Sequence, residues 1–216
     1  MGVRVMACAM CGAMCGAMVG LAAVAAWAEP ISENGYAVGC DAQSAPVVCT
    51  IAAAGFNLAI LQEGGTAPDL FARLQRMDPV TAVRFAGDLG ALGDSSATVV
   101  LTALEPRGDD LYEGNLRAMQ GRWQPVGEAT PFVVEIVGLD WLEVVQDEVA
   151  GAFQMVVGEA CGDGILPGNG MVTALYRYGD DPGDDACWRV EYVDETTLEL
   201  RDFKGDQGLV AFARAE

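Results

Sequence analysis

The chain has 216 residues, of which 12 are basic and 31 acidic, and it contains no histidine. With no histidine and a single lysine, Lys204, it cannot build a Ser-His-Asp or Cys-His catalytic unit or a His-ligated zinc site, so we expect no enzyme. The excess of negative charge repels phosphate backbones, which argues against nucleic acid as a partner.

The first 28 residues predict a secretory signal peptide. Arg4 precedes a long apolar run that ends in Ala26-Trp27-Ala28, which puts small residues at the third and first positions before Glu29. We expect cleavage after Ala28, and hence a periplasmic or secreted protein with no membrane span after cleavage. A retained membrane anchor and a lipoprotein attached at Cys15 are the alternatives.

Removal of this segment leaves four cysteines, and it leaves 11 basic against 31 acidic residues, a net charge near −20. An even number of cysteines in an exported chain favours two disulfides over a metal cluster. Cys40 and Cys49 are close enough in sequence to staple one hairpin, which leaves Cys161 with Cys187 by elimination. The sequence alone permits all three pairings.

Residues 29–108 predict a small α+β domain. Short strands are expected at 35–40, 46–51 and 56–61, and further strands at 80–88 and 97–104. Between them, Thr66-Ala67-Pro68-Asp69 begins an amphipathic helix whose apolar face runs from Leu70 to Met77. The run from Val83 to Leu101 resembles strands of an OB-type barrel, although the same residues suit any hairpin.

Residues 109–216 predict a second domain, after a polar boundary at 105–110. Helical spacing from Leu111 to Met119 leads directly into Gly121-Arg122-Trp123. Short turns should pair each of the following strands with its neighbour, and eight such antiparallel strands tend to close into an up-and-down barrel. The eight strands are expected at 120–125, 131–137, 139–145, 152–158, 171–178, 186–193, 197–203 and 209–213.

Residues 116–214 resemble a minimal lipocalin-like (calycin) barrel. The resemblance consists of the short helical turn, Gly121-x-Trp123 in the first strand, eight up-and-down strands and Arg214 in the last strand. It implies that Trp123 plugs one end of the barrel and that Arg214 packs over its ring in a cation–π contact. The later motifs of the family are missing, so the resemblance names no ligand.

The Cys161–Cys187 pairing fits a strict up-and-down barrel badly. Cys161 follows the fourth strand and Cys187 begins the sixth, so the two should lie toward opposite ends. A disulfide requires Cα atoms only about 5.5 Å apart. Either residues 162–170 double back, or the strand count differs by one, or the pairing is different.

Strict alternation predicts which side chains point into the barrel. An apolar interior with a few polar tips is typical of a small-molecule site, while a packed core with no cavity is the alternative. The candidate ligand-binding residues are Phe153, Met155, Tyr176, Tyr178, Trp188 and Tyr192.

No cofactor or metal is expected. The acidic loop at 179–185 holds four carboxylates around a Gly/Pro turn, but the spacing differs from an EF-hand loop and favours a solvated hairpin tip over a calcium site. We therefore expect an exported, mainly β binding protein that holds a small apolar or amphipathic ligand in its C-terminal barrel. The alternative is an acidic protein-interaction module, such as an inhibitor or envelope-assembly factor, that has a filled barrel and contacts a basic protein partner.

Overall fold

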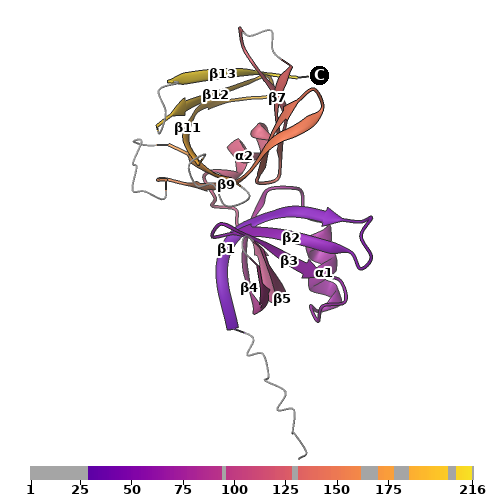
Figure 1. Cartoon of the computed structure of the whole chain (residues 1–216). Helices are drawn as coiled ribbons and strands as arrows, with labels where there is room; N and C mark the ends of the chain where they lie inside the picture. The colour runs from indigo at the N-terminus through magenta and orange to yellow at the C-terminus, as the bar shows by residue number, and fades with distance from the viewer. Residues whose placement is uncertain are drawn as a thin grey trace, which may run out of the picture.

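The computed structural model describes residues 29–93, 96–127, 131–161, 170–177, 185–203 and 208–215. The predicted signal peptide, Tyr178, most of the acidic loop and Lys204 lie outside these residues. The described part of the chain forms two closed β-barrels that follow one another in sequence and lie against each other (Figure 1). None of the helices within it is long and apolar enough to span a membrane.

The first barrel corrects the prediction of an α+β domain. Its strands close in the order β1-β2-β3-β5-β4, with β3 and β5 parallel and every other pair antiparallel. One helix, α1 (Pro68–Gln75), connects β3 to β4. The strands are β1 (Glu29–Asp41), β2 (Val48–Ala53), β3 (Phe56–Leu61), β4 (Thr81–Leu92) and β5 (Ser96–Pro106).

The length of β1 is what closes this barrel. Residues 29–37 of this strand pair with β4, and residues 36–41 pair with β2, so one strand joins both edges of the sheet. Helix α1 packs Phe71 and Leu74 into the barrel core. The N-cap of this helix is Ala67, and the preceding Thr66 accepts through its hydroxyl a hydrogen bond of 2.9 Å from the N–H of Leu101, which ties the start of α1 to β5.

The second barrel confirms the predicted eight-stranded antiparallel architecture. Each strand pairs with its neighbour in sequence, and β13 pairs with β6 to close the ring. Helix α2 (Glu113–Met119) precedes the first strand and buries Leu116 and Met119 in the barrel core. The strands are β6 (Gly121–Pro125), β7 (Phe132–Val137), β8 (Asp140–Val145), β9 (Glu148–Gly158), β10 (Val172–Arg177), β11 (Ala186–Val193), β12 (Thr197–Asp202) and β13 (Leu209–Arg214).

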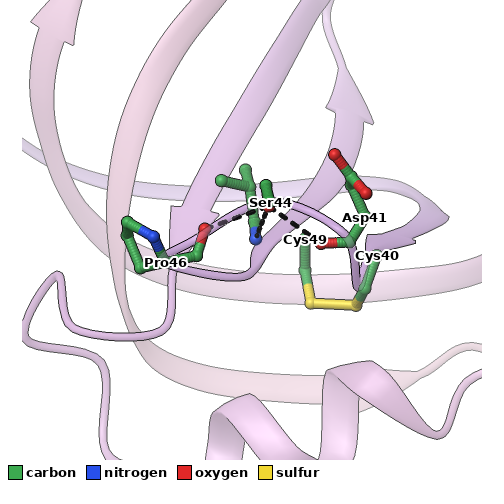
Figure 2. Close-up of a disulfide and its surroundings, with 6 residues drawn as sticks. Cys40, Asp41, Ser44, Pro46 and Cys49 are labelled. Carbon is green, nitrogen blue, oxygen red and sulfur yellow. Dashed lines mark hydrogen bonds between the residues drawn. A yellow bond between two sulfur atoms is a disulfide. The ribbon is translucent and has the colours of Figure 1, made fainter.

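The Cys40–Cys49 disulfide joins the ends of β1 and β2, which confirms the predicted hairpin staple. In the loop between them, the Ser44 hydroxyl lies 2.9 Å from the carbonyl oxygens of Asp41 and of Pro46 (Figure 2). The same hydroxyl accepts a hydrogen bond from the N–H of Val48 at 3.2 Å. One side chain therefore organises the loop that the disulfide closes.

The Cys161–Cys187 disulfide is also confirmed, with Cα atoms 6.0 Å apart. The expected conflict with the barrel disappears because β10 is short. Cys187 pairs with Ala174, which in turn pairs with Val156 near the end of β9. Cys187 therefore lies at nearly the same height along the barrel as the residues before Cys161. The two cysteines pack with Val172 and Ala174 in a small cluster. The two disulfides indicate an oxidising, extracytoplasmic environment.

Candidate functional site

The interior of the second barrel contains three of the six predicted ligand-binding residues. Phe153 and Met155 are buried in the core of this barrel, and Trp188 is half-buried and packs against the same core. Their inward orientation agrees with the alternation of the sequence. Their role in binding a ligand stays a prediction.

Tyr176 and Tyr192 do not line this interior, so the predicted orientation of both is wrong. Tyr176 is 37% exposed, because Thr173 and Leu175 are the residues of β10 that pair with inward-facing neighbours. Tyr192 is 50% exposed because the register of β11 shifts between Val190 and Tyr192. Such a β-bulge inserts one residue and reverses which side chains face inward beyond it. Tyr178 lies outside the described residues.

Large side chains fill the described interior of the second barrel. Trp141 and Phe212 meet edge to face, with ring centroids 6.3 Å apart. Among the buried polar atoms of this barrel, Trp141 Nε1 and Thr173 Oγ1 have no hydrogen-bond partner in the described residues. The side chains that are buried together here include Leu116, Met119, Trp123, Val134, Ile136, Trp141, Phe153, Met155, Leu198, Leu200 and Phe212.

One end of the barrel is closed by Trp123, which is fully buried, and by Arg214. The indole Nε1 donates to the carbonyl oxygen of Met119 at 2.7 Å, and the Arg214 guanidinium lies 4.2 Å from the centre of the ring. Arg214 also donates to the carbonyl oxygens of Ala118 and Gln120. A side chain at Gly121 would approach the guanidinium to 2.5 Å, and the φ of Gly121 is +111°, so glycine is required here.

A cleft of about 380 Å³ lies where the two barrels meet. Its wall comes from β1, the β2–β3 turn, the 107–112 segment, the β7–β8 turn and the end of β9. Its lining combines apolar groups, including Ala52, Leu139 and Val156, with polar groups such as Tyr36 and Gln154. A mixed lining at a domain interface is the usual makeup of a small-molecule site.

A polar bridge between the barrels forms part of the wall. The Tyr36 hydroxyl, on β1, donates to the Asp110 carboxylate at 3.1 Å. Arg107 Nη1 lies 3.4 Å from the same carboxylate, and Asp110 Oδ1 accepts hydrogen bonds from the N–H groups of Tyr112 and Glu113 at the start of α2. Burial raises the pKa of Tyr36 above its ordinary value, and the nearby charge of Asp110 raises it further. The Tyr36 phenol is therefore neutral and donates.

Apolar packing fixes the barrels on either side of this bridge. Val80 and Ala52 of the first barrel are buried in the same cluster as Leu139 of the second. Val38 contacts the β7–β8 turn so closely that there is no room for a side chain at Gly138. A hydrogen bond of 3.3 Å joins Gln154 of β9 to Asn57 of β3. The cleft is thus held by contacts on several sides.

Comparison with protein-family models, with curated proteins and with solved structures gives no match to this chain. The site therefore has to be interpreted from its own chemistry. Across the residues that the structure describes, no three His, Cys, Asp or Glu side chains come together in a way that could hold a metal ion.

Sequence reasoning missed the cleft. Tyr36 and Asp110 are 74 positions apart, and neither belongs to a motif or to an apolar alternation that marks it as part of a site. The one signal in the sequence is Arg107-Gly108-Asp109-Asp110, a polar segment that predicts a domain boundary. A charged segment between two domains is a place where they can contact each other.

Proposed function

We propose that the protein is an exported binding protein that holds a small apolar or amphipathic ligand in the cleft between its two barrels. The observation that carries this proposal is the cleft itself, about 380 Å³ in volume and walled by both barrels. Ligand pockets commonly have volumes of about 300 to 1,000 Å³ and occur preferentially at domain interfaces. The absence of histidine and the single lysine support binding over catalysis.

The second barrel, in this proposal, is lipocalin-like. The fit of Arg214 over Trp123, with Gly121 leaving room for the guanidinium, supports that relationship. The packing of large side chains in the interior supports the filled form of such a barrel over a hollow one. We therefore assign the ligand to the cleft and give the barrel the role of a rigid wall.

Export to the periplasm is the remaining part of the proposal. The two disulfides support an oxidising compartment, and the sequence of residues 1–28 supports a signal peptide that is cleaved after Ala28. The mature chain begins at Glu29, which is also the first residue of β1.

Native mass spectrometry of the protein purified from the periplasm tests the proposal. We expect a chain that starts at Glu29, a mass four hydrogen atoms below that of the reduced chain, and a bound small molecule. Val156→Trp fills the cleft with an indole, and this variant should lose the small molecule while it keeps its disulfides and its thermal unfolding transition.

A bare wild-type mass, together with no thermal stabilisation by a periplasmic small-molecule extract, would contradict the proposal. Retention of the small molecule by Val156→Trp would place the ligand elsewhere, with the barrel interior as the next site to examine. Trp188 and Phe153 are the residues to substitute in that case.

An acidic protein-interaction module that contacts a basic protein is the second candidate function. The net charge near −20 favours it, as do exposed apolar side chains near the ends of barrel strands, namely Val126, Val145, Val149 and Leu209. Binding of a basic partner by surface charge should weaken clearly with added salt and should survive Val156→Trp. Binding in the cleft should not survive that substitution.

A further inference from the structure

The charged side chains of the cleft are unbalanced. Three of them are acidic, Asp109, Asp110 and Glu159, and one is basic, Arg107. Arg107 already lies 3.3 Å from Asp109 and 3.4 Å from Asp110, so its charge is compensated within the wall. The lining therefore carries an excess of two negative charges, and the strongly acidic chain around it adds a field of the same sign.

Two tyrosine rings lie among these carboxylates. Tyr36 and Tyr112 both line the cleft, and both are half-buried. Burial raises the pKa of Tyr112, and the negative charges of Glu159 and Asp110 raise it further. Both carboxylates thus interact electrostatically with the phenol of Tyr112. Neutral aromatic rings beside carboxylates form an environment that attracts a cation through ring and charge together.

Apart from the amides of Asn34 and Gln154, most of the remaining wall is apolar. Ala52, Ala53, Leu139 and Val156 line it, and Leu111 stands at the cleft with 83% of its surface exposed. These apolar groups offer no ligands to a small hydrated ion, so such an ion would keep its water shell. They can bury the hydrocarbon part of a larger guest.

We propose that the cleft recognises a cationic amphipathic small molecule, an alkylamine or a quaternary ammonium compound. Its positive head lies among Tyr36, Tyr112 and Glu159, and its hydrocarbon part lies against Ala52 and Val156. This inference rests on the proposed function, because it assigns a ligand class to the same cleft. It adds that the ligand is positively charged, which the proposed function does not require.

Calorimetric titration of the full mature protein with three probes of equal chain length tests the inference. The probes are decyltrimethylammonium, decyl maltoside and decyl sulfate, each below its micellar concentration. We expect the cationic probe to bind about tenfold more tightly than the neutral one, and the anionic probe to bind most weakly.

Charge-neutralising variants then locate the cation. Glu159→Gln removes an exposed carboxylate at the cleft, and it should weaken the cationic probe about threefold without changing the neutral one. The matched control is Glu148→Gln, which removes an exposed carboxylate at the start of β9, away from the cleft lining, and should leave all three probes unchanged.

The outcomes separate this inference from the proposed function. Equal binding of the cationic and neutral probes, abolished by Val156→Trp, would overturn the cation inference and leave the cleft as the ligand site. Cation binding that survives both Val156→Trp and Asn34→Trp, the second of which blocks the cleft from an exposed position on β1, would overturn both proposals. No binding of any probe would also overturn the cation inference, and native mass spectrometry would then decide the proposed function.

Discussion

The Tyr36 hydroxyl on the first barrel donates a hydrogen bond to Asp110, and Asp110 in turn accepts the N–H groups at the start of α2 in the second barrel. One carboxylate thus receives donors from both halves of the molecule. Its side chain is only 8% exposed, so these donors replace the water that a carboxylate would otherwise bind. This pair contributes, beside the apolar packing, to the relative position of the barrels.

Removal of the Tyr36 hydroxyl should weaken the contact between the barrels. We expect Tyr36→Phe to lower the free energy of unfolding by about 1.5 to 3 kcal/mol, because hydrogen bonds to charged groups contribute about that much. Denaturant unfolding measures the loss, and a double-mutant cycle with Asp110→Asn isolates the pair. The matched control is Tyr112→Phe, which removes a hydroxyl from the same cleft. Equal losses in the two phenylalanine variants would contradict the assigned role of Tyr36.

Gly121→Ala should destabilise the closed end of the second barrel. The added methyl group would meet Arg214 Nη1 at 2.5 Å and would require the left-handed φ of +111°. Gly127→Ala is the control, because Gly127 also has a positive φ, +89°, but has open space around it. We expect a loss of about 1 kcal/mol for the control and about 2 to 4 kcal/mol for Gly121→Ala, together with a change in Trp123 fluorescence. Similar losses in both variants would show that the guanidinium moves aside without cost.

Two buried threonines should respond in opposite directions to the same substitution. The Thr173 hydroxyl has no partner among the described residues, so Thr173→Val should stabilise the protein by about 1 kcal/mol. The Thr66 hydroxyl accepts from Leu101, so Thr66→Val should destabilise it by about 1 to 2 kcal/mol. Thermal unfolding compares the two. A clear loss of stability in Thr173→Val would indicate that a group inside the barrel binds this hydroxyl.

The two disulfides should differ in their contribution to stability. In the chain-entropy model, a loop of 26 residues between Cys161 and Cys187 gives about 3.5 kcal/mol, and a loop of 9 between Cys40 and Cys49 gives about 2.6 kcal/mol. Denaturant unfolding of the two paired Cys→Ala variants measures both values. A larger loss for the Cys40 and Cys49 pair would mean that strain or residual structure outweighs loop closure.

The turn after Tyr192 should resist moderate acid and lose stability as the pH falls toward 2. The Tyr192 hydroxyl donates to Asp194 at 2.7 Å, and the N–H groups of Thr196 and Thr197 also donate to it. These hydrogen bonds lower the pKa of Asp194 from 3.8 to about 2, and the hydrogen bond from Tyr192 has the largest effect. Because the folded pKa is depressed, the contribution to stability is complete above about pH 4, declines as the pH falls toward 2, and is lost below that.

Nuclear magnetic resonance titration of the Asp194 carboxyl checks this prediction. Tyr192→Phe should raise the pKa of Asp194 and still leave it below 3.8, because the two backbone donors remain. A wild-type titration near 3.8 would mean that the turn is open in solution.

Local patterns were enough to predict the second barrel. Each of its strands pairs with its sequence neighbour, so alternation and turn residues determine the ring. The contact of Trp123 with Arg214 was expected from the resemblance to a lipocalin-like barrel, and it is present. Alternation failed on β10, where Thr173 and Leu175 face inward in place of Tyr176, and on β11, where the chain departs from period two. The bulge between Val190 and Tyr192 turns Tyr192 outward, and no residue in this stretch predicts a bulge.

The first barrel and the cleft depend on contacts between distant segments. The polar start of β1, from Glu29 to Asn34, has no apolar alternation, yet it pairs with β4 and closes the ring. The parallel pairing of β3 with β5 crosses a helix and leaves no periodic signal. The cleft then requires both barrels to be in place, since Tyr36 and Asp110 meet only across their interface.

The pairing of β13 with β6 also determines when the second barrel can be completed. Phe212 and Arg214 pair with Pro125 and Trp123, about ninety positions earlier in the chain. Until these last residues arrive, two strands expose unpaired backbone groups that can recruit a strand from another molecule. A chain truncated before Leu209 would keep seven of the eight strands and both disulfides, yet we expect it to aggregate rather than to fold with reduced stability.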